Sequence, residues 1–92
     1  MEHVTETGRY ANITSSTLVY TGACDLLGIF VAGASATPTI KVWDQTSAAA
    51  PIVIGTFTPS AGTFYPFPSH CGSGIYVTIS GTVDCTVFYV VR

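Results

Sequence analysis

The chain has little charge. Only 9% of its 92 residues are Asp, Glu, Lys or Arg, against about 25% in an average soluble domain. Its three basic residues, Arg9, Lys41 and Arg92, cannot form the cluster that neutralises nucleic-acid phosphates unless the symmetry of an oligomer gathers them, so we expect no nucleic-acid partner. Apolar residues reach 48%, which predicts that another chain, most simply a second copy, covers part of the surface. A neutral monomer coated with Ser and Thr is the alternative.

The chain also lacks an export signal and a long apolar run. Its first ten residues contain no basic region followed by an apolar stretch, as a secretory signal would. The longest apolar run, residues 26–34, is well short of the roughly 20 residues that a membrane helix needs. We therefore expect synthesis in a cytoplasm, no membrane partner, and conditions that disfavour disulfides.

Cysteine is scarce and shows no motif. The chain has three cysteines, an odd number, and none of them is in a C-x-x-C motif. Buried free thiols are therefore the favoured interpretation for Cys24, Cys71 and Cys85. A disulfide between two of them in an oxidising medium stays open. A metal site of Cys with His70 is disfavoured, because His70 and Cys71 would point to opposite faces of a strand. No metal or cofactor is expected.

No catalytic arrangement stands out. Residues 71–74 (CGSG) resemble the stretch around a papain-type nucleophile only faintly, because the chain is too short for the distant His and Asn. A catalytic triad of His70, Asp84 and Cys85 would form only if the fold brought these residues together. The same holds for a pair of carboxylates of the glycosidase type. We therefore expect no catalytic residues and no enzyme activity.

What the chain does contain is a series of short β-rich runs separated by Gly, Pro, Ser and Asp, with no helical apolar period or helix caps. Residues 34–37 and Gly81 are expected to be turns, and residues 69–74 a loop. Pro66 and Pro68 remove two backbone donors, which predicts an edge strand or a loop there. The expected strands are 17–21, 24–32, 39–44, 52–58, 63–65, 75–80 and 85–91.

These runs predict an all-β fold, a small two-sheet β-sandwich that is jelly-roll-like. The sandwich is expected to span residues 17–92, and residues 1–16 to form a polar N-terminal arm or, alternatively, the first strand. In the run 24–32, apolar residues occupy both odd-numbered and even-numbered positions. Because successive side chains of a strand point to opposite faces, this pattern predicts a strand buried on both faces.

Several apolar residues are candidates for contacts between chains. In the arm, Val4, Tyr10 and Ile13 could anchor on a neighbouring subunit. Trp43 and, in the last strand, Phe88 are expected at the subunit contact. Four aromatic residues could instead line a sugar-binding face, although we favour ordinary packing for them. They are Trp43, Tyr65, Tyr76 and Tyr89.

A recurring pattern over roughly residues 18–91 resembles a group of small bacteriophage virion proteins. It is made of apolar and turn residues and contains no catalytic motif, so no site residues carry over. The matching runs are 26–29 (LLGI), 37–47 (TPTIKVWDQTS), 56–59 (TFTP) and 74–82 (GIYVTISGT), followed by a Val-rich end.

The resemblance implies a virion component of the head-decoration, or cement, type. Such a protein would sit on the phage head as a homotrimer and clamp neighbouring copies of the major capsid protein. A carbohydrate- or receptor-binding module of a phage tail or fibre is the alternative.

Overall fold

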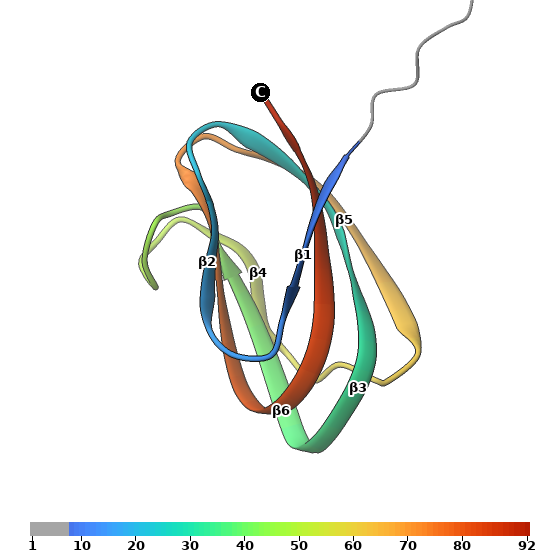
Figure 1. Ribbon diagram of the computed structural model, residues 1–92. Coiled ribbons are helices and arrows are strands. Elements are labelled where there is room, and N and C mark those ends of the chain that lie inside the picture. The colour runs from blue at the N-terminus through green and yellow to red at the C-terminus, as the bar shows by residue number, and fades with distance from the viewer. Residues whose placement is uncertain (1–7) are drawn as a thin grey trace, which may run out of the picture.

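The computed structural model describes residues 8–92, so the predicted contact of Val4 lies outside the described residues. Within that range the chain forms strands and no helix (Figure 1), which confirms the all-β prediction. The strands are β1 (Arg9–Ile13), β2 (Thr17–Thr21), β3 (Cys24–Trp43), β4 (Ile52–Phe57), β5 (Thr63–Cys71) and β6 (Gly74–Val91).

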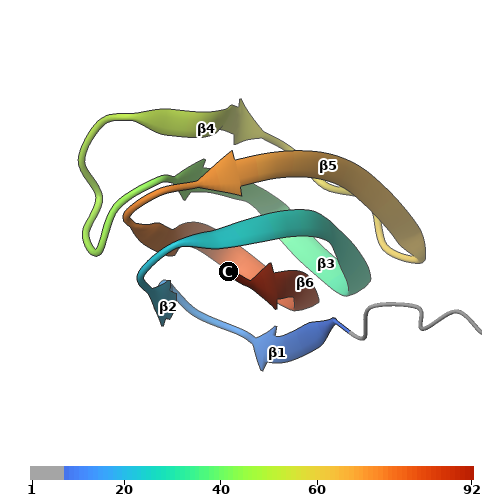
Figure 2. The same cartoon turned by 90° about the horizontal axis from the view of Figure 1, so that it is seen from above.

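Two long antiparallel strands form the centre of the fold. β3 has 20 residues and β6 has 18, and they pair from Cys24 opposite Val91 to Trp43 opposite Tyr76. The outer edge of β6 carries β2 along its first half and β1 along its second half. The outer edge of β3 carries β5 along its first half and β4 along its second half. All six strands therefore belong to one antiparallel sheet, which curls strongly (Figure 2).

The two segments that the sequence predicts to be separate turns lie side by side and form a single corner of this sheet. Residues 34–37 lie within β3 and Gly81 lies within β6, so neither reverses the chain. The register of β3 against β6 shifts between Ser35 and Thr39, next to Gly81. Thr37 and Gly81 have φ angles of 49° and 84°, which bend their strands sharply. Both strands thus bend together and stay paired.

The fifth strand is longer than its sequence predicts. It was expected to end at Tyr65, yet β5 continues to Cys71 and replaces much of the expected 69–74 loop. Among the described strands it pairs with β3 alone. Because β5 is an edge strand, Pro66 and Pro68 are tolerated there, as the edge alternative predicted.

The core fills the inside of the curl and joins both halves of the sheet. Ile13 brings β1 into this core, so the segment holding Tyr10 and Ile13 lies against the edge of β6. The alternating pattern of the last two predicted strands is confirmed, with Ile75, Val77, Cys85 and Val87 pointing inward. The largest fully buried side chains are Leu26, Ile29, Val31, Ile40, Val42, Ile75, Val77, Val83 and Val87.

Candidate functional site

The strand predicted to be buried on both faces is buried on only one. Leu26, Ile29 and Val31 of β3 are fully buried in the core. Leu27 and Phe30, which point to the other side, are 40% and 37% exposed. Both sides of this strand are apolar, as its sequence pattern predicts, but no other strand of residues 8–92 packs over the outer side.

These two residues belong to a larger apolar surface, which we call the aromatic face. It lies on the outer side of β1, β6, β3 and β5, where Tyr10 pairs with Phe88 and Phe30 pairs with Phe64. Together with Gly8 its residues line a shallow hollow of about 560 Å³. The aromatic face consists of Tyr10, Leu27, Phe30, Phe64 and Phe88.

A glycine in β3 leaves room for the aromatic side chains of the two neighbouring strands to meet above it. Gly28 lies between Phe88 on one neighbouring strand and Pro66 on the other. A Cβ at Gly28 would lie 2.5 Å from Cζ of Phe64 and 2.6 Å from the carbonyl oxygen of Tyr65. The bare backbone therefore lets the Phe64 ring lie across β3 towards Phe88.

Polar groups border the aromatic face at both ends. At one end, Asn12 donates hydrogen bonds from Nδ2 to Oδ1 of Asp84 (2.8 Å), to the carbonyl oxygen of Cys85 (3.0 Å) and to Oγ1 of Thr86 (3.3 Å). At the other end, Asp25 and His70 lie beside Leu27. An apolar centre with a polar border is the usual anatomy of a protein–protein interface.

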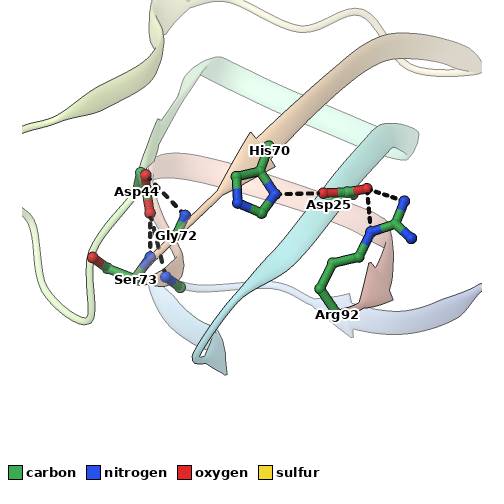
Figure 3. Close-up of polar contacts among 7 residues, drawn as sticks. Asp25, Asp44, His70, Gly72, Ser73 and Arg92 are labelled. Atoms are coloured by element: carbon green, nitrogen blue, oxygen red, sulfur yellow. Dashed lines mark hydrogen bonds and ion pairs between the residues drawn. The ribbon is translucent and has the colours of Figure 1, made fainter.

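Asp25 organises the second end of this border (Figure 3). Its Oδ2 accepts a hydrogen bond from Nε of Arg92 at 2.6 Å, and its Oδ1 lies 2.7 Å from Nδ1 of His70. Nη2 of Arg92 also contacts the carboxylate. The hydrogen bond from Arg92, and next that from His70, lowers the pKa of Asp25, so the group stays ionised at neutral pH.

A second apolar row crosses the other half of the sheet. Register places Leu18, Tyr76, Trp43 and Ile52 side by side across β2, β6, β3 and β4. Leu18 and Ile52 at the two ends are 42% and 49% exposed. We call these four residues the tryptophan row.

The tryptophan ring in this row is already engaged within the chain. Its Nε1 donates a hydrogen bond to Oγ1 of Thr78 at 2.8 Å. The Nζ atom of Lys41 lies over the Trp43 ring, 4.3 Å from its centroid, which is a cation–π contact. Both the polar edge and one face of the indole are therefore occupied.

The four aromatics considered for a sugar-binding face do not come together. Trp43 and Tyr76 are partners in the tryptophan row. Tyr89 is buried in the core and packs on Tyr20, while Tyr65 packs on Phe57. Ordinary packing therefore accounts for Tyr65 and Tyr89, as their sequence pattern predicts.

A third polar feature closes the turn between β5 and β6. Oδ1 of Asp44 accepts hydrogen bonds from the backbone N–H groups of Ser73 (2.8 Å) and Gly74 (3.3 Å). Its Oδ2 accepts one from the N–H of Gly72 at 3.2 Å (Figure 3). One carboxylate at the end of β3 thus satisfies three donors of a neighbouring turn, a structural role typical of Asp in loops.

The three cysteines are free thiols with fully buried side chains. Burial raises the pKa of Cys71 and of Cys85 to about 11, and raises that of Cys24 as well. Within residues 8–92, no three His, Cys, Asp or Glu side chains gather as a metal site would require. The same part of the chain holds no helix long and apolar enough to cross a membrane.

Of the predicted contact residues, the structure brings Tyr10 and Phe88 together on the aromatic face. Ile13 lies in the core and Trp43 in the other half of the sheet. Leu27, Phe30 and Phe64 were not singled out as contact residues. The two-sided apolar pattern of 24–32 was the signal that could have identified Leu27 and Phe30.

No protein-family model, curated protein or solved structure matches the chain.

Proposed function

We propose that the protein is a structural component of a phage virion, a capsid decoration protein that works as a homo-oligomer through its aromatic face. The aromatic face itself carries the proposal. The exposed parts of Tyr10, Leu27, Phe30 and Phe64 amount to about 400 Å², taking roughly 200 Å² for a whole large side chain. One partner in a standard interface contributes roughly 800 Å², so this apolar centre with its polar border fits one subunit contact.

The phage setting, the trimer and the major capsid protein as partner come from the sequence resemblance. Low charge supports the same interpretation, because a particle surface tiled by neighbouring subunits needs few charges to keep the chains apart. In this proposal the two halves of the curled sheet act as the two layers of a jelly-roll-like sandwich, with the aromatic face on the outside of one layer.

Sedimentation at tens of micromolar tests the self-association. We expect the parent protein to sediment as an oligomer, and Phe64→Ser and Tyr10→Ser to shift it towards the monomer. Ile52→Ser is the matched control, since Ile52 is similarly exposed but lies in the tryptophan row. A parent that sediments as a monomer, or equal effects of Phe64→Ser and Ile52→Ser, would contradict the proposal.

The virion role needs its own measurement. Purified phage particles should contain the protein in hundreds of copies, located on the head in a density map. A few copies located on the tail would instead favour the second candidate function.

That second candidate is a carbohydrate-binding module on a tail or fibre, and the pairing of Trp43 with Tyr76 is the observation that favours it. Its weakness is that Thr78 and Lys41 already occupy the indole. Glycan-array binding that Trp43→Ala abolishes and Phe64→Ser preserves would establish this function in place of decoration.

A further inference from the structure

Two of the buried cysteines lie directly opposite each other in the sheet. Cys24 of β3 and Cys71 of β5 are register partners in an antiparallel pair, and both are fully buried. Their side chains therefore point to the same, inner face. Cys85 lies opposite Val31 of β3 and Ile13 of β1, away from the other two thiols.

This arrangement meets the main geometric requirement of a disulfide. Directly opposed residues in antiparallel strands have Cα atoms about 4.5–5.5 Å apart, and disulfides form at Cα separations of about 4.4–6.8 Å. The Cβ atoms of such a pair need to approach by only about 1 Å to reach disulfide spacing.

We propose that Cys24 and Cys71 form a dithiol pair that closes to an intramolecular disulfide when the protein meets a small disulfide oxidant such as oxidised glutathione. The thiolate of Cys71 attacks one sulfur of the oxidant, forming a mixed disulfide and releasing one reduced glutathione. The thiolate of Cys24 then displaces the second glutathione from Cys71. Two thiols are oxidised, one disulfide of the oxidant is reduced, and the two thiol protons leave with the two released thiolates.

Access to Cys71 is controlled by the turn that follows it. The carboxylate of Asp44 holds the backbone N–H groups of Gly72, Ser73 and Gly74. Within residues 8–92, β5 is an edge strand paired with β3 alone, so release of this turn uncovers Cys71 without breaking the β3–β6 pair. Opening at a strand end is the least costly kind of local unfolding.

Asp44 also slows the chemistry electrostatically. After burial, the negative charge of Asp44 is the next cause of the raised pKa of both Cys24 and Cys71. A raised pKa leaves little of the reactive thiolate at neutral pH. The pair therefore reacts slowly, and it closes only slowly even when the oxidant is in excess. The pairing depends on the register of β3 and β5, and does not rest on the proposed virion role.

The test is to incubate the reduced full-length protein with oxidised glutathione, then denature it, alkylate the remaining thiols and map the peptides by mass spectrometry. We expect a mass loss of two hydrogens, one alkylated cysteine at Cys85, and a linked peptide pair holding Cys24 and Cys71. Cys85→Ala should behave like the parent, whereas Cys24→Ser should give no intramolecular link.

Asp44→Ala should speed the closure at least tenfold, because it releases the turn and removes the charge. Urea well below the unfolding midpoint opens the same strand end in the parent protein, and serves if the variant does not fold. Three alkylated cysteines after oxidation in both the parent in urea and the variant would overturn the inference. A link that involves Cys85, or a stable glutathione adduct on Cys71, would overturn it as well.

Discussion

The ring of Phe64 meets the ring of Phe88 edge to face across β3, with centroids 6.2 Å apart and planes at 65°. The residue beneath them is Gly28, which pairs with Phe88 on one side. Two aromatic side chains from strands that do not pair with each other are thus joined over a backbone without a side chain. This contact gives the aromatic face its continuous surface.

Gly28→Ala should therefore destabilise the protein by about 2 kcal/mol, the usual cost of forcing extra atoms into a packed site. The new Cβ would press on the Phe64 ring and on the carbonyl oxygen of Tyr65, and the carbonyl belongs to the backbone and cannot move freely. Urea unfolding gives the measurement. Gly55→Ala is the control, because a Cβ there meets no atom within 4 Å; equal losses in the two variants would contradict this account.

Ile13→Ala should lower the free energy of unfolding by about 2–4 kcal/mol, since it removes a side chain that β1 buries in the core. Tyr10→Ala on the same strand should change it by less than about 0.5 kcal/mol when the protein is monomeric, because Tyr10 is 74% exposed. Thermal melting of dilute protein compares the two. Deletion of residues 2–14 removes β1 entirely and should abolish cooperative melting; a deletion variant that melts like the parent would show that β1 is dispensable.

Asp44→Ala should cost about 1–3 kcal/mol, because three backbone N–H groups lose their acceptor. The loss of stability should be confined to the turn between β5 and β6. Native-state hydrogen exchange should speed up at Gly72, Ser73 and Gly74, and change little at β1. Asp84→Ala, which removes the acceptor of a single bond from Asn12, is the control. Unchanged exchange in the turn would argue against the role given to Asp44.

The contribution of Asp25 should depend on pH. Contact with Arg92, and next with His70, lowers its pKa below the ordinary value of 3.8, so the ionised group stabilises the folded state above that value. The stabilisation is lost as the pH falls through the lowered pKa and the carboxylate takes up a proton. Asp25→Asn should therefore melt at a lower temperature than the parent at pH 7, and the difference should shrink as the pH falls below 3.8 and through the lowered pKa of Asp25. A difference that grows on acidification would contradict this sign.

The strands of this fold were predictable where one face is buried and the other is not. Ile75 and Val77 alternate with Tyr76, Thr78 and other residues that carry polar groups, and the alternation directly reports the inner face. The corner was not predictable in this way. Gly81 carries the local signal of a turn, yet a sharp bend within a paired strand uses the same residue type.

The aromatic face was only half predictable. Apolar residues on both sides of 24–32 indicate that both sides become covered, but a single sequence does not say whether the cover is the same chain or another. Phe64 could not be assigned to the face at all, because its partners Phe30 and Phe88 come from β3 and β6. Such pairings depend on topology, which local pattern does not report.

The central position of β6 also has a consequence for synthesis on the ribosome. β6 follows all the other described strands in the chain, and it pairs with β1, β2 and β3. When β1 and β2 emerge, the strand they pair with has not yet been translated, so the sheet cannot close until β6 has left the exit tunnel. Folding of the sheet must then wait for β6, and until β6 is available the apolar β3 is exposed to chaperones and to other nascent chains.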